Sequence, residues 1–188
     1  MKKLQLLVLA LFVAFAFTKA EAQTKKIDIS KSKIVWIGKK ITGQHEGTIN
    51  FKEGYLIFKD NKVAGGNFTV DMTSLTNTDL KGGSKTKLEG HLKSDDFFGV
   101  YNFKTSTLAF KSIGTKGNDI YLITADLTIK GITKTVQFEL IVKGNTATAH
   151  VVIDRTKFNI EYGSGSFFED LGDKTIYNDF DLNVDLSF

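Results

Sequence analysis

The amino-acid sequence predicts an all-β domain in which about eight strands form an antiparallel barrel or sandwich, with at most one short helix. The first observation is a long amphipathic hairpin over 120–142, where apolar and polar residues alternate on both sides of Gly131. Successive side chains of a strand point to opposite faces, so each arm has one apolar and one polar face. The second observation is the same alternation at the end of the chain, over 180–188. A regular final strand favours a closed sheet, because closure removes unpaired edges.

The other strands are predicted from shorter alternating runs and from the turn residues between them. Two short strands, 47–51 and 55–60, are expected to be separated at Lys52-Glu53-Gly54. The pair Gly65-Gly66 predicts a bulge or a sharp bend within the next strand, 63–72. In chain order, the strands outside the hairpin are expected at 34–37, 47–51, 55–60, 63–72, 102–111, 145–154 and 180–188.

Two long segments, 73–101 and 155–178, lack this alternation. A short helix is expected over 84–94, with Ser84 as its N-cap. Long irregular segments in compact domains are commonly lids or binding loops. Each segment carries an adjacent phenylalanine pair that either plugs an end of the barrel or borders an entrance for an apolar ligand. The pairs are Phe97-Phe98 and Phe167-Phe168.

The first residues predict export. Two lysines precede an apolar run over 4–17, and Ala20-Glu21-Ala22 has the small-x-small pattern of a cleavage site. These features are typical of a secretory signal peptide over 1–22, cleaved near Ala22. The alternative, a membrane anchor, needs a longer apolar run to cross a bilayer. A single mature domain, 23–188, is therefore expected in the periplasm or outside the cell.

The composition argues against nucleic-acid binding. The predicted cleavage removes three lysines and one glutamate from 25 basic and 21 acidic residues, which leaves 22 and 20. Arg155 is the only arginine, whereas nucleic-acid sites favour arginine clusters with interleaved aromatic residues. The sequence contains no cysteine, so the exported domain is expected to depend on its apolar core rather than on disulfides.

No motif of the sequence predicts catalysis, a metal site or a cofactor. His45, His91 and His150 lie in separate elements without ligand spacing, and satisfied or surface histidines are expected. The run Gly163-Ser164-Gly165-Ser166 lacks the strand-to-helix setting of a nucleophile elbow. The carboxylates Glu169, Asp170 and Asp173 are expected to lie in a solvated loop; the alternative is a weak calcium site that lacks the full ligand pattern. A non-catalytic protein is therefore predicted.

Arg155 follows Asp154 at the end of a predicted strand, and two interpretations are open. It forms a structural ion pair that holds the following loop, or its planar guanidinium contacts the head group of a ligand.

Three motifs resemble the YceI-like, polyisoprenoid-binding proteins. They are HLKSDDFF at 91–98, ADLTIKGITK at 125–134, and Arg155 followed by Phe158. The similarity spans essentially the whole mature chain in the same order. Two departures concern loops: Leu88-Glu89 stands where the family commonly has Arg-Asp, and Tyr101-Asn102-Phe103 lacks the family's proline.

The resemblance implies an extended lipocalin-like antiparallel β-barrel whose apolar bore holds a long lipid. The expected ligand is a polyisoprenoid, an isoprenoid quinone or a fatty-acid-like chain, and transient membrane contact is expected. Each buried CH₂ group contributes about 0.8 kcal/mol, so a long chain binds without a polar anchor. The residues expected at the cavity wall or its mouth are Trp36, Phe68, Phe97, Phe98, Phe138 and Phe158, with Arg155 as the candidate head-group contact.

Two alternatives remain at this point. An integral outer-membrane barrel also ends in an alternating strand and a terminal phenylalanine such as Phe188. Against it, the chain has one tryptophan and five tyrosines, and strands such as 47–51 are shorter than the roughly 9–11 residues of a span. The other alternative, a secreted enzyme acting on a lipid or polysaccharide, needs paired carboxylates or a nucleophile–base pair in the bore.

Overall fold

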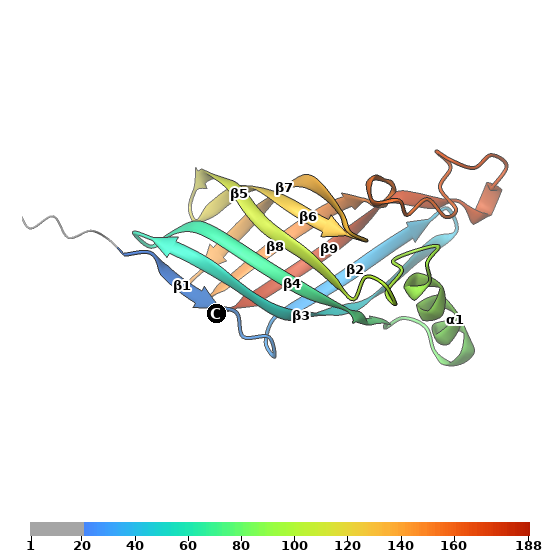
Figure 1. Cartoon of the computed structure of the whole chain (residues 1–188), viewed down its shortest axis with the longest axis horizontal. Helices are drawn as coiled ribbons and strands as arrows, with labels where there is room; N and C mark the ends of the chain where they lie inside the picture. Colours follow the sequence, from blue (N-terminus) through green and yellow to red (C-terminus); the bar gives the residue numbers. More distant parts are fainter. Residues whose placement is uncertain (1–20) are drawn as a thin grey trace, which may run out of the picture.

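The computed structural model describes residues 21–188, which form a closed antiparallel barrel of eight strands with one α-helix at one end (Figure 1). The predicted signal peptide, apart from its last two residues, lies outside the described residues. The elements are β1 (Gln23–Lys26), β2 (Lys33–Lys40), β3 (Gly43–Lys59), β4 (Lys62–Asn77), α1 (Gly82–Lys93), β5 (Thr105–Gly117), β6 (Ile120–Ile129), β7 (Ile132–Lys143), β8 (Thr146–Asp154), the 3-10 turns η1 (Arg155–Phe158) and η2 (Gly172–Lys174), and β9 (Ile176–Ser187).

The barrel closes through two pairings. The order β3-β2-β9-β8-β7-β6-β5-β4 returns to β3 because β3 also pairs with β4. The last strand joins the first strand of the barrel, with Lys33 opposite Asp185. The short β1 pairs with the far end of β3, beyond the stretch of β3 that β2 covers. The closed sheet predicted from the final strand is confirmed.

The predicted hairpin is β6 and β7. Ile129 pairs with Ile132, and the turn between them is Lys130-Gly131. Both turn residues have positive φ, 50° and 74°, as a two-residue hairpin turn that follows the twist of the strands requires. Alternate residues of β6 are buried in the barrel, namely Tyr121, Ile123, Ala125, Leu127 and Ile129.

The outward face of this hairpin is polar. Thr135 Oγ1 donates to Asp126 Oδ1 at 3.1 Å, and the hydroxyls of Thr128 and Thr133 are 2.8 Å apart. An integral membrane barrel has the opposite pattern, with an apolar band facing outward. The arrangement of β6 and β7 therefore does not fit that alternative.

The expectation of two separate strands at 47–51 and 55–60 is wrong, because both belong to the 17-residue β3. The pairing of β3 with β4 shifts register between Phe51 and Glu53, so the strand bends there without ending. Gly54 is needed for close packing: a Cβ atom would lie 2.5 Å from the ring of Phe68. The argument from short strands against a membrane barrel consequently fails.

The bulge predicted at Gly65-Gly66 is confirmed. Ile57 pairs with Gly65, but the next residue of β3, Phe58, pairs with Val63, so one residue of β4 is extra. Such a bulge increases local bending, which a closing sheet needs.

The predicted helix is α1, which begins two residues earlier than expected. Its N-cap is Lys81, with no capping hydrogen bond from a side chain, so the assignment of Ser84 as the cap is wrong. The helix contacts β4 and lies at the same end of the barrel as the segment between β8 and β9 (Figure 1). Within residues 21–188, no helix is long and apolar enough to cross a membrane.

Candidate functional site

The interior of the barrel is not completely filled. A cavity of about 360 Å³ lies among inward-facing residues of the strands, a size usual for small-molecule sites. It reaches the end of the barrel that carries α1, where Lys40 and Asp179, both exposed, form part of its rim. On the helix, Leu88, His91 and Leu92 face this space. The cavity is thus walled by the sheet and bordered at its mouth by α1.

Five of the six aromatic residues predicted at the cavity line it, and one does not. Phe158 is packed in the core, with an exposed fraction of 1%, and is not among the residues that line the cavity. It ends η1, so the two-residue alternation of β8 no longer determines its direction. Ligand contact at the other five remains a prediction. These five are Trp36, Phe68, Phe97, Phe98 and Phe138.

The sequence reasoning missed part of the aromatic wall. The rings of Phe51, Phe68, Phe110 and Phe138 form a chain with centroid distances of 6.0, 5.9 and 6.1 Å between successive rings. Such spacings are typical of favourable tilted or edge-to-face pairs. The signal was available, because Phe51 and Phe110 have the same parity as the buried Ile49 and the lining Leu108. Most of the remaining wall is aliphatic.

Arg155 is buried near the mouth, where three backbone carbonyls hold its guanidinium. Nε donates to the carbonyl oxygen of Tyr177 at 3.0 Å, Nη1 to that of Ile160 at 2.7 Å, and Nη2 to that of Ile176 at 3.0 Å. The guanidinium carbon lies 5.5 Å from the centre of the Phe97 ring. These contacts join η1, the segment after it and the start of β9.

The interpretation of Arg155 as a member of a structural ion pair is wrong, because its guanidinium donates to backbone carbonyls and not to a carboxylate among the described residues. The Asp154 carboxylate accepts hydrogen bonds from the backbone and hydroxyl of Thr156 at 3.0 and 2.6 Å. No carboxylate within residues 21–188 forms a salt bridge with Arg155. Burial lowers the pKa of Arg155, while the nearby charge of Asp154 raises it. Arg155 also lines the cavity, and contact with a head group remains a prediction.

The three histidines differ. His45 Nδ1 lies 2.8 Å from Asp79, and His150 Nε2 lies 3.2 Å from Asp181, so both have partners, as expected. The expectation is wrong for His91, whose Nε2 is buried without a hydrogen-bond partner among the described residues. No group of metal-ligating side chains is found within 21–188.

The family model of the YceI-like domain matches residues 26–188. The chain belongs to the YceI-like domain family. A curated relative, a UPF0312 protein of Shewanella denitrificans, is 32% identical over 90 residues, which cover 48% of this chain and 45% of that protein. The match thus spans less than half the length of that relative.

Solved structures share the YceI-like fold. BcnA of Burkholderia cenocepacia aligns with a TM-score of 0.69 at 23% identity, over 85% of this chain and 98% of that one. A polyisoprenoid binding domain from Saccharophagus degradans, implicated in plant cell wall breakdown, aligns at 0.57 and 13% identity, over 89% and 97%. The YCEI protein of Campylobacter jejuni aligns at 0.56 and 19%, over 74% and 82%. At these identities the likeness concerns the fold, and it confirms the lipocalin-like barrel.

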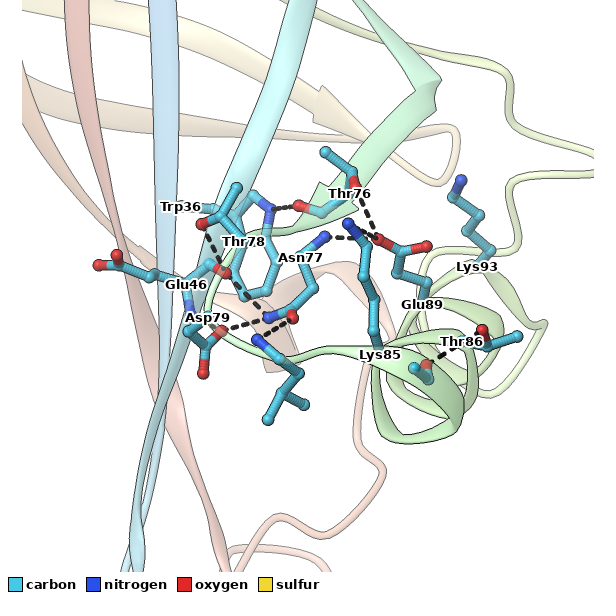
Figure 2. Close-up of polar contacts among 12 residues, drawn as sticks. Trp36, Glu46, Thr76, Asn77, Thr78, Asp79, Lys85, Thr86, Glu89 and Lys93 are labelled. Carbon is cyan, nitrogen blue, oxygen red and sulfur yellow. Dashed lines mark hydrogen bonds and ion pairs between the residues drawn. The ribbon is translucent and has the colours of Figure 1, made fainter.

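In this YceI-like domain, Glu89 ties α1 to the end of β4 (Figure 2). Its Oε1 accepts from Thr76 Oγ1 at 2.6 Å and from the backbone N–H of Asn77 at 2.7 Å. These two hydrogen bonds lower the pKa of Glu89, and the charges of Lys85 and Lys93 act in the same direction. The position of α1 at the mouth therefore depends on an ionised carboxylate.

The same network extends to the cavity wall and to β3 (Figure 2). Trp36, which lines the cavity, donates from Nε1 to the carbonyl oxygen of Thr76 at 3.2 Å. The side chain of Asn77 is fully buried; it donates to the carbonyl oxygen of Glu46 at 2.9 Å and to Asp79, and accepts from the N–H of Leu80 at 2.8 Å. Trp36 is thus connected to the helix through the end of β4.

Proposed function

We propose that the protein is an exported, non-catalytic binding protein that holds a long apolar lipid inside the barrel for storage or transport. The observation that carries the proposal is the cavity, whose wall consists mainly of aromatic and aliphatic side chains. The description of the Saccharophagus degradans domain as polyisoprenoid binding supports the same ligand class. A polyisoprenoid, an isoprenoid quinone or a fatty-acid-like chain fits such a wall.

Burial of the chain itself provides the affinity. At about 0.8 kcal/mol per CH₂, a chain of three or four isoprene units contributes on the order of 10 kcal/mol before the costs of association. Affinity should therefore increase with chain length, because each unit adds a similar increment.

A hydrolytic function receives less support. The cavity wall contributed by residues 21–188 includes one carboxylate, Asp179, at the rim. Hydrolysis of a glycosidic bond commonly uses two carboxyl groups on either side of the bond. Catalysis by a serine or threonine nucleophile would need a base beside it, and neither Ser106 nor Thr107, the serine and threonine of the wall, has a side-chain hydrogen bond to a base among the described residues.

Location at the periplasm or outside the cell follows from the signal peptide predicted over 1–22. Contact with a membrane is the natural route for a water-insoluble ligand. Phe167 and Phe168, in the loop between β8 and β9, have exposed fractions of 51% and 48%. That loop lies at the end of the barrel that carries α1 (Figure 1). Exposed aromatic side chains of this kind are suited to the interface of a bilayer.

Native mass spectrometry of the protein purified from the periplasm without detergent tests the proposal. We expect a mature chain beginning at Gln23 with an added mass that organic solvent removes. Geranylgeraniol added back to the stripped protein should change the fluorescence of Trp36, which lines the cavity. Absence of an adduct together with an unchanged Trp36 signal would contradict the proposal.

A further inference from the structure

We propose that His91 Nε2 binds an uncharged oxygen at the end of the lipid, so that the cavity selects apolar chains ending in a hydroxyl or carbonyl group. This inference rests on the proposed lipid-binding function and adds the chemistry of the ligand's polar end. It starts from the buried Nε2 atom, which has no hydrogen-bond partner among residues 21–188.

His91 lies where α1 meets the cavity. Leu88, His91 and Leu92 have the spacing of one helical face, and all three line the cavity. His91 is the only polar residue of α1 among them. A leucine at this position would complete an apolar face, so the imidazole introduces hydrogen-bonding capacity that packing does not need.

Aromatic neighbours hold the imidazole ring without satisfying it. The ring meets Tyr162 edge to face with a centroid distance of 4.4 Å, and Phe97 similarly at 5.5 Å. Neither contact supplies a hydrogen bond to Nε2. Buried polar atoms in native proteins nearly always have partners, and an exception calls for an explanation such as a ligand. His45, which also lines the cavity, and His150, which does not, each have a carboxylate partner within the protein.

The number of free donors favours a neutral oxygen over a phosphate or carboxylate. An anionic group needs several charge-assisted hydrogen bonds to replace its water. Nε2 provides one hydrogen bond, either as donor or as acceptor. Three cations of residues 21–188 line this end of the cavity: Arg155 already donates from each of its three nitrogens to a backbone carbonyl, Lys39 pairs with Asp181, and Lys40 is exposed at the rim. The rim also carries the negative charge of Asp179.

Binding of three matched ligands tests this inference, with Trp36 fluorescence of the delipidated full-length mature protein as the readout. The ligands are geranylgeraniol, the same chain without its hydroxyl, and geranylgeranyl phosphate. We expect the wild type to bind the alcohol about tenfold more tightly than the hydrocarbon, the difference that one good hydrogen bond makes. The phosphate should bind no more tightly than the alcohol.

Three variants test whether His91 causes the preference for the alcohol over the hydrocarbon. His91→Leu should bind both the alcohol and the hydrocarbon with similar affinity, because only the hydrogen bond is lost. His91→Gln, whose amide reaches about as far as Nε2, should keep most of the preference. His150→Leu is the control, since His150 is exposed and does not line the cavity. His91→Leu is expected to fold, because it removes an unpaired buried polar atom, and its melting temperature checks this.

The outcomes separate the two proposals. An alcohol preference that persists in His91→Leu, or a wild type that binds alcohol and hydrocarbon equally, would overturn the role of His91 and leave the lipid-binding function intact. Tightest binding of the phosphate, lost in His91→Leu, would overturn the choice of a neutral oxygen. Failure of the wild type to bind any of the three chains would contradict the lipid-binding function and this inference with it.

Discussion

At the scale of single residues, Arg155 shows how a position can be predicted while its contacts cannot. Its status as the only arginine indicates a role that lysine does not fill. Arg155 donates to the backbone carbonyl oxygens of Ile160, Ile176 and Tyr177. The side chains of these residues do not indicate that their carbonyl groups accept these hydrogen bonds. Backbone acceptors have no sequence signature, so the interpretation as a carboxylate ion pair was the natural error.

Replacing Arg155 with lysine should destabilise the domain by about 2–4 kcal/mol. An ammonium group keeps the charge but cannot reach three separate carbonyl oxygens in the plane of a guanidinium. The midpoint of urea denaturation measures the loss, with Lys157→Arg as an exposed control expected to change little. An unchanged midpoint for Arg155→Lys would mean that the three hydrogen bonds contribute nothing net.

For His91, the side of the helix on which it lies could be predicted, but the absence of a hydrogen-bond partner could not. Its presence on the cavity side of α1 follows from helical spacing once Leu88 and Leu92 are known to face inward. That its Nε2 has no partner among the described residues depends on the rings of Phe97 and Tyr162, which come from other segments. Long-range packing of this kind cannot be derived from spacing.

At the scale of elements, the strands of the hairpins could be predicted from the sequence, whereas the points at which a strand ends or continues could not. Alternation identified β6 and β7, because a buried and a solvated face leave a period of two. The same rule divided β3 in two, since Gly54 resembles a turn residue although its role is to admit the Phe68 ring. Glycine has both uses, and the choice depends on what packs against it.

Two glycine-to-alanine substitutions should therefore have opposite effects on stability. Gly131→Ala places a side chain at φ 74° and 3.2 Å from the ring of Phe103, and should destabilise by about 1–2 kcal/mol. Gly90→Ala, within α1 and with no atom within 4 Å of the new Cβ, should stabilise by about 0.5–1 kcal/mol. Thermal melting of the two variants measures both, and shifts of the same sign would refute this assignment.

The contact of α1 with β4 should weaken in acid. Because hydrogen bonds from Thr76 and Asn77 lower the pKa of Glu89, its contribution to stability is complete above the ordinary carboxyl value of 4.5. This contribution to stability is lost as the pH falls through the lowered pKa of Glu89. Protonation removes the negative charge of the carboxylate that accepts the two hydrogen bonds. Burial raises the pKa of Asp79 nearby, but hydrogen bonds from His45, Glu46 and Asn77 lower it below its ordinary value, so this carboxylate contributes to the same acid dependence.

Comparison with Glu89→Gln isolates this contribution. The variant should lose about 1 kcal/mol of stability at neutral pH. As the pH falls below 4.5, its stability should fall less steeply than that of the wild type. Unfolding followed by Trp36 fluorescence measures both curves, and parallel curves would exclude a role for ionised Glu89.

At the scale of the whole molecule, closure could be predicted and the cavity could not. Alternation establishes which residues face inward, and the regular final strand implies a partner on each side. Whether the interior is solid or hollow depends on the summed sizes of side chains from all strands, and period alone does not contain that information. The two phenylalanine pairs leave an entrance for an apolar ligand as one of two interpretations, but the expectation of a lipid inside the barrel comes from the family resemblance.

Exchange of lipid with membranes should depend on the exposed aromatic pair at the mouth end. Phe167→Ser with Phe168→Ser should slow transfer of a fluorescent lipid between vesicles about tenfold, because two interfacial side chains are lost, while equilibrium affinity for geranylgeraniol stays the same. Leu122→Ser, a partly exposed apolar residue on the barrel wall, is the control. Equal transfer rates for the double variant and the control would contradict the membrane contact.

The pairing of β2 with β9 also has a kinetic consequence. It joins Lys33 to Asp185, so the seam cannot form until nearly the whole chain is available. Until then β2 and β8 each present an open edge that other chains can join. Contacts so distant in sequence form slowly. Pairing of the final strand, β9, with β2 and β8 therefore ends the aggregation-prone stage of folding. A delay in this pairing prolongs that stage.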